Sequence, residues 1–78
     1  MPRIIAYHPE FLVDDGDGGV VRLVLALDDW YSDEEVLEKL ASWTGSSSLS
    51  GAVAAIRDDN TRGDRGNIIS ARIERIGD

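Results

Sequence analysis

The sequence predicts a small α+β domain with the element order β-β-α-α-β. Three observations predict it: β-type apolar runs towards both ends of the chain, two stretches with helical spacing between them, and turn-rich segments at the boundaries. A three-stranded, mostly antiparallel sheet with both helices packed on one face buries these apolar stripes most simply. At 78 residues the chain has room for one domain, so we expect residues 1–78 to form a single α+β unit.

Two strands are expected in the first third of the chain. The β-branched and aromatic run 4–7 would end at Pro9, and the extended pattern resumes at 11–13, so the first strand should be bent or split there. The turn-rich segment 14–19 then forms a hairpin into a strand at 20–27. Both faces of that second strand are largely apolar, which indicates a central strand, and its core face should carry Val21, Leu23, Leu25 and Leu27.

A helix is predicted over residues 33–44. Ser32 and Glu35 form a capping box, and three consecutive acids complement the positive end of the helix. Tyr31 can pack against Val36 at the helix start, and Gly45 is placed to end the helix. The expected apolar stripe consists of Val36, Leu37, Leu40, Ala41 and Trp43.

A shorter helix and a closing strand follow. Leu49, Ala52, Val53 and Ile56 have the i, i+3, i+4, i+7 spacing of a helix face, with Ser47 or Ser48 as its cap. The glycine-rich and charged segment 61–66 is expected to be a loop. Residues 68–76 then predict the last strand, whose core face should carry Ile69, Ala71 and Ile73.

The charge is concentrated in one part of the chain. The first fifty residues contain ten acidic and three basic side chains, a formal charge of −7, whereas residues 51–78 contain five of each. Such a field attracts cationic partners and repels phosphate, so direct binding to nucleic acid is disfavoured. The apolar runs are too short for a membrane span, and we expect a protein of the cytoplasm, in a bacterial cell or a phage-infected host, with no membrane partner.

No pattern typical of catalysis or of metal binding is present. The absence of cysteine excludes disulfides, thiolate nucleophiles and cysteine-based metal sites. The three aspartates in 14–19 partly resemble a calcium loop, but Gly19 and Ala26 stand at two ligand positions, which favours an acidic hairpin turn. His8 is the single histidine, and the serines at 46–48 lack a nucleophile-elbow pattern. We therefore predict no enzyme, no catalytic residue, no metal and no cofactor.

The candidate partner-binding residues lie where the second strand meets the first helix. The sequence Asp28-Asp29-Trp30-Tyr31 leads directly into the acidic first turn of that helix. Aromatic anchors ringed by charge are typical of protein interfaces, because the rings bury area and the carboxylates steer a basic partner. The predicted site consists of Asp28, Asp29, Trp30, Tyr31, Glu34, Glu35 and Glu38.

These features favour a non-catalytic binding protein that blocks a basic, nucleic-acid-binding surface of a partner protein, such as part of a nucleoprotein complex. The chain is small, acidic and cysteine-free, and as a class it resembles the phage-encoded inhibitors of host defence such as anti-CRISPR proteins. One alternative is a structural or assembly subunit, either a virion component or a small homo-oligomer such as a homodimer, that pairs through its sheet edges. A second alternative is a helix-turn-helix transcriptional regulator, although the second helix offers only Arg57, followed by Asp58 and Asp59.

Overall fold

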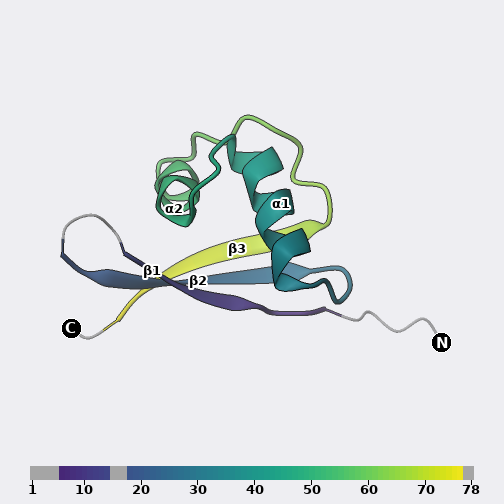
Figure 1. Cartoon of the computed structure of the whole chain (residues 1–78), viewed down its shortest axis with the longest axis horizontal. Coiled ribbons are helices and arrows are strands. Elements are labelled where there is room, and N and C mark those ends of the chain that lie inside the picture. Colours follow the sequence, from purple (N-terminus) through teal and green to yellow (C-terminus); the bar gives the residue numbers. More distant parts are fainter. Residues whose placement is uncertain (1–5, 15–17, 77–78) are drawn as a thin grey trace.

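The computed structural model describes residues 6–14 and 18–76. Its elements are β1 (Glu10–Asp14), β2 (Val20–Leu27), α1 (Asp33–Thr44), α2 (Leu49–Arg57) and β3 (Ile68–Arg75). The strands form one antiparallel sheet in the order β1-β2-β3, and both helices lie on the same face of it (Figure 1). The predicted fold class and element order are confirmed.

The first predicted strand is interrupted at Pro9. Before the interruption Tyr7 forms an isolated antiparallel bridge with Leu27, in which Tyr7 N and Leu27 O are 3.1 Å apart. Pro9 has no N–H to donate, but its carbonyl accepts a hydrogen bond from Leu25 N at 3.1 Å. Because Pro9 cannot donate the second hydrogen bond of its pair with Leu25, the ladder to β2 is interrupted here and β1 begins at Glu10. The start of the predicted strand, Ile4 and Ile5, lies outside the described residues, as do Asp15 and Asp17 of the predicted turn.

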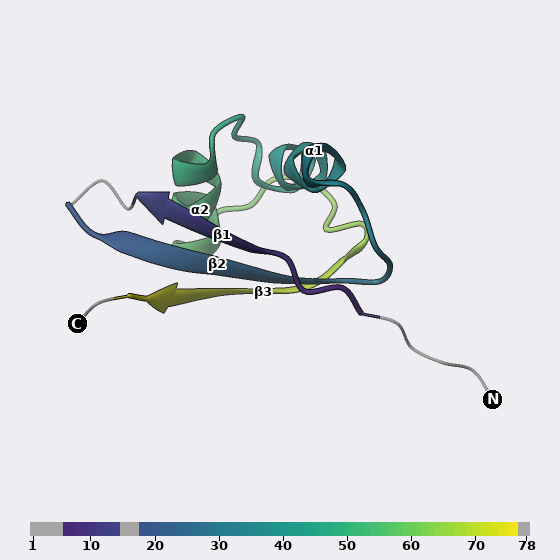
Figure 2. The same ribbon diagram turned by 60° about the horizontal axis from the view of Figure 1, so that its bottom comes forward.

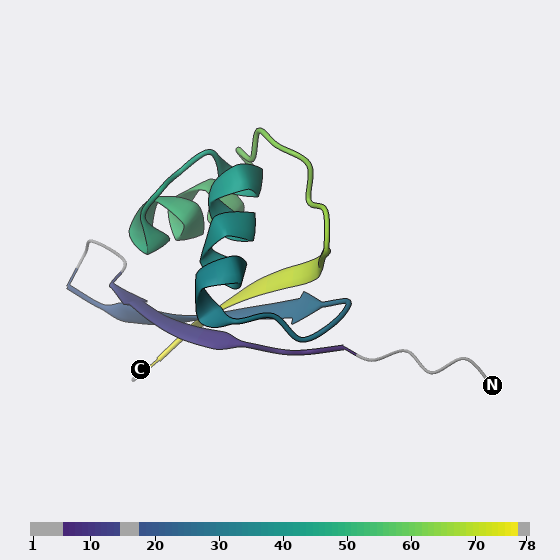
Figure 3. The same ribbon diagram turned by 45° about the vertical axis from the view of Figure 1, so that its right-hand side comes forward.

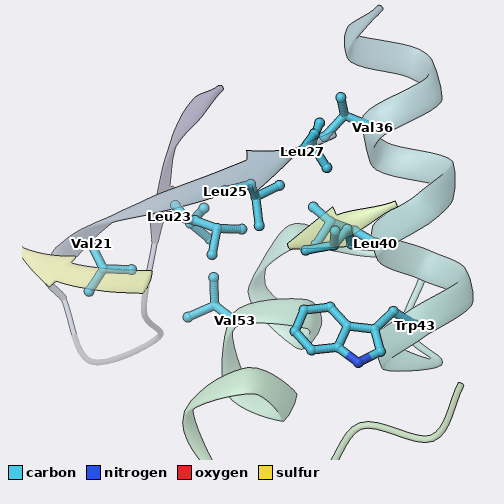
Figure 4. Close-up of a cluster of buried hydrophobic side chains, with 10 residues drawn as sticks. Val21, Leu23, Leu25, Leu27, Val36, Leu40, Trp43 and Val53 are labelled. Atoms are coloured by element: carbon cyan, nitrogen blue, oxygen red, sulfur yellow. The ribbon is translucent and has the colours of Figure 1, made fainter. Parts of the chain in front are cut away.

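The core lies between β2 and the two helices. The alternate residues of β2 that point towards the helices are almost completely buried, as the sequence predicts. They pack against one stripe of α1 and against Val53 of α2 (Figure 4). The strands run across Figure 2 while α1 is seen nearly end-on, so α1 crosses the strand direction. The labelled core residues are Val21, Leu23, Leu25, Leu27, Val36, Leu40, Trp43 and Val53.

The ends of α1 are fixed by the residues that the sequence indicates. The Ser32 hydroxyl accepts from Glu35 N at 3.3 Å, and the Glu35 carboxylate accepts from Ser32 N at 3.1 Å, which completes the capping box. Gly45 ends the helix in the left-handed region, with φ 77°, and donates to the carbonyl of Ala41 at 2.8 Å. One predicted core position is wrong: Leu37 is 39% exposed, because it lines the open groove between α1 and the start of α2.

A bulge changes which residue of β3 enters the core. The β2–β3 register is regular from Val21 to Ala26 and then shifts, so that Leu27 faces Ile68. Ile68 is therefore buried at 2%, and Ile69 becomes the extra residue, 48% exposed. The prediction that Ile69 faces the core is wrong for this reason. Ala71 and Ile73 pack against the core as predicted.

Candidate functional site

The predicted site begins with a carboxylate that the fold uses internally. Asp28, at the end of β2, accepts hydrogen bonds from Asn67 Nδ2 at 2.9 Å and from the Tyr31 hydroxyl at 2.7 Å. The hydrogen bond from Asn67, and next that from Tyr31, lower the pKa of Asp28. The same bond from its hydroxyl to Asp28 raises the pKa of Tyr31 to about 12. Asp28 thus ties the end of β2 to the segments that precede α1 and β3.

Lys39 supplies a positive charge to this acidic region. Its ammonium group lies 4.3 Å from the centroid of the Tyr31 ring and donates to Asn67 Oδ1 at 2.8 Å. The i, i+4 spacing of Glu35 and Lys39 on α1 is the sequence signal that would have placed this cation near the site. Glu35 is itself engaged in the capping box, where the backbone N–H of Ser32, and next its hydroxyl, lower the pKa of the carboxyl group.

Trp30 is the most exposed aromatic side chain at the site. Its side chain is 64% exposed, and its ring centroid lies 6.0 Å from that of Tyr7, at an interplanar angle of 51°. The Trp30 backbone N–H donates to Asp29 Oδ1 at 2.7 Å, which orients this carboxylate towards the Trp30 backbone. Tyr7 was missed by sequence reasoning, because only the bridge across β2 brings it to this end of the sheet.

The seven predicted residues therefore divide into two sets. Asp28, Tyr31 and Glu35 make hydrogen bonds within the chain, which hold the segment between β2 and α1 in place. The other four lack such bonds among the described residues. They are exposed, Asp29 accepts only from the adjacent Trp30 N–H, and no ion pair in this part of the chain includes any of their carboxylates. We call these four the acidic–aromatic group: Asp29, Trp30, Glu34 and Glu38.

The other motifs of the sequence have structural uses or lie partly outside the described residues. The Ser48 side chain caps α2 by accepting from Gly51 N, as the sequence predicts. His8 is exposed. No three His, Asp or Glu side chains within 6–14 and 18–76 are grouped to hold a metal ion, and none of the helices in these ranges is long and apolar enough to span a membrane.

We expect the free energy of unfolding to fall in acid. The pKa values of Asp28 and Glu35 lie below their ordinary values of 3.8 and 4.5. Stabilisation from these carboxylates is complete above those ordinary values and is lost as the pH falls through the lower values of the folded state. Thermal unfolding followed by circular dichroism between pH 7 and pH 2 would measure this loss. Asp28→Asn should reduce the pH dependence, and an unchanged dependence in that variant would contradict the assignment.

The fold and the acidic–aromatic group define a small α+β protein with an exposed aromatic side chain in an acidic segment. Comparison with protein-family models, curated proteins and solved structures finds no match to this chain.

Proposed function

We propose that the protein is a non-catalytic binding protein whose acidic–aromatic group docks on a basic, nucleic-acid-binding surface of a partner protein. The observation that carries this proposal is the 64% exposure of Trp30 in a segment whose neighbouring carboxylate, Asp29, has no ion pair among the described residues. Burial of a large exposed ring by a partner stabilises the complex, and tryptophan is enriched among the residues that dominate binding energy. A carboxylate without an ion pair in the described part of the chain, such as the adjacent Asp29, complements lysine and arginine side chains.

The action of such a protein would be competition with nucleic acid. The carboxylates of Asp29, Glu34 and Glu38 would occupy cations that otherwise contact phosphates, and the body of the domain would exclude the nucleic acid sterically. Glu34 and Glu38 lie one turn apart on α1, so they project from the same side of that helix. The formal charge of −7 would accelerate association with a basic surface, and salt would reduce this effect.

The hydrogen bonds of Asp28 support the proposal through preorganisation. They link the segment that carries Trp30 to Asn67, which precedes β3, and join its two ends through Tyr31, while the Tyr7 ring lies 6.0 Å from the indole ring. A side chain that is already ordered before binding loses less conformational entropy in the complex. The internally bonded residues of the predicted site would thus contribute to binding by positioning the exposed ones.

Displacement of a fluorescent DNA duplex from purified basic DNA-binding proteins at low salt tests the proposal. The protein should displace the duplex from at least one of them. Trp30→Ala and the triple variant Asp29→Asn, Glu34→Gln, Glu38→Gln should each weaken displacement by about tenfold or more.

A second triple variant controls for net charge. Asp58→Asn, Asp59→Asn and Asp64→Asn remove the same number of charges outside the candidate site and should leave displacement within about twofold of the parent protein. Equal losses in the two triple variants would show that only the total charge matters. That result, or displacement from none of the proteins, would overturn the proposal.

A further inference from the structure

The outer side of β3 is an uncovered sheet edge. β3 has eight residues, with neither proline nor glycine, whereas the opposite edge strand β1 has five residues and follows Pro9. No strand in the described part of the chain pairs with β3 on the side away from β2 (Figure 2). Arg65 Nη1 donates to the carbonyl of Ile69 at 3.0 Å and so covers the beginning of this edge. Residues 70–76 are left as a template for another strand.

The sheet face opposite the helices carries a chain of ion pairs that ends at this edge. Arg22 on β2 contacts Glu10 on β1 at 3.2 Å and Glu74 on β3 at 3.4 Å. Glu74 also contacts Arg72 at 2.8 Å. The Arg72 side chain is 67% exposed, and the residue directly opposite it on β2 is the uncharged Val24. Arg72 therefore pairs with Glu74 of its own strand and remains accessible at the open edge.

We infer that a second copy of this chain pairs with β3, so that two β3 strands run antiparallel with Ile73 facing Ile73 of the other copy. In this register Arg72 of each copy lies directly opposite Glu74 of the other, and such opposite-charge pairs stabilise neighbouring strands. Across the strands, Glu74 then lies between two arginines: Arg22 on β2 of its own copy and Arg72 on β3 of the other. Ser70 lies opposite Ile76, so the pairing spans the part of the edge that Arg65 leaves open.

Neighbouring registers are unfavourable on charge or on geometry. Pairing centred on Arg72 or on Glu74 puts two like charges directly opposite each other. If one strand slides along the other by one residue, side chains that face the helices lie opposite side chains that face away from them. This happens because side chains alternate between the two faces along a strand. The register centred on Ile73 keeps the helices of both copies on the same side of one six-stranded sheet.

The charge of the whole molecule favours this edge for contact between two copies. Each copy carries a formal charge of −7, so most approaches bring like charges together. β3 is a locally positive strand, because Arg72 and Arg75 outnumber Glu74. The contact is isologous, so it closes at two copies. Trp30 stays available, since its partner Tyr7 pairs with β2 on the side opposite β3.

Sedimentation equilibrium over a concentration series is the first test, with a monomer–dimer equilibrium as the expected result. Arg72→Glu should raise the dimer dissociation constant by about tenfold or more, because two opposite-charge pairs become like-charge pairs. Arg57→Glu makes the same change in net charge on α2 and should leave dimerisation within about threefold. Circular dichroism would verify that both variants fold. A monomer at every concentration, or equal effects of the two variants, would overturn the inference. So would a mass that keeps increasing with concentration, because β1 of one copy would then pair with β3 of the next.

Cysteine pairs test the register directly, because the natural chain contains no cysteine. Arg72→Cys and Glu74→Cys, mixed and oxidised, should form a disulfide between the two variants. Directly opposed residues have Cα atoms about 4.5–5.5 Å apart, within the range that a disulfide spans. Each variant oxidised alone should crosslink at least about fivefold less, since its cysteines lie two residues out of register. Equal crosslinking in all three samples would exclude the register.

Discussion

Replacing Leu25 by alanine should lower the free energy of unfolding by about 3 kcal/mol. Leu25 is fully buried at the centre of β2, where it contributes to the cluster formed with α1 and α2 (Figure 4). The substitution removes apolar area and leaves a cavity that a rigid strand cannot close, and such changes cost about 2–5 kcal/mol. A chain of this length has a total stability of about 4–12 kcal/mol, so this one change removes a large part of it.

Leu12→Ala is the matched control for Leu25→Ala. Leu12 lies in the same sheet, on β1, but its side chain is 69% exposed on the face away from the helices. Its truncation leaves no cavity, and we expect a change within about 0.5 kcal/mol. Urea unfolding monitored by circular dichroism would give both values. Similar losses in the two variants would contradict the location of the core on the helix side of β2.

The helices could be predicted accurately because their determinants are local. Ser32, Glu35 and Gly45 act within a few residues of the helix ends, so their spacing in the sequence is enough to place both ends of α1. β3 was predicted less accurately because its pairing depends on a distant strand. Alternation alone places Ile69 in the core, but the bulge opposite Leu27 places Ile68 there instead.

Prediction of the candidate site was also limited by contacts between residues distant in the sequence. Charge and aromatic content identified the segment from Asp28 to Tyr31, but they could not separate carboxylates that bond to other parts of the chain from those that do not. Asp28 differs from Asp29 because Asn67, directly before β3, lies within hydrogen-bond distance of it. That distinction arises from tertiary contacts between segments far apart in the sequence. The sequence proposes both aspartates as partner contacts, and the distinction between them follows only once the fold is known.

The segment 58–67 contains another feature that local reasoning missed. Its residues 61–66 were predicted to be a loop from their glycines and charges, and the segment passes over the C-terminal end of α1 on its way to β3 (Figure 3). The backbone N–H groups of Arg62 and Gly63 both donate to the carbonyl of Trp43, at 3.1 and 2.9 Å. Arg65 also lies over the Trp43 ring, 5.5 Å from its centroid. The loop thus binds the end of α1 and covers Trp43.

Gly63→Ala should therefore lower the free energy of unfolding by about 2 kcal/mol. An added Cβ would overlap the backbone carbonyl oxygen of Ser42 and would lie 3.3 Å from Trp43 Cα. Backbone atoms cannot rotate away as a side chain can, so the loop has to move, at a cost in the range of about 1–3 kcal/mol for overpacking. This movement also weakens the two hydrogen bonds to Trp43 O.

Gly66→Ala separates this steric effect from backbone preference. Gly66 has φ 62°, but an added Cβ there has no atom within 4 Å, so its cost is limited to about 1 kcal/mol of conformational strain. In a Trp30→Phe background, Trp43 is the single tryptophan and reports on the loop by fluorescence. Gly63→Ala should shift its emission to the red as the 8% exposure of Trp43 increases, whereas Gly66→Ala should not. An unshifted emission and a small stability loss in Gly63→Ala would mean that the loop does not pack on α1 in solution.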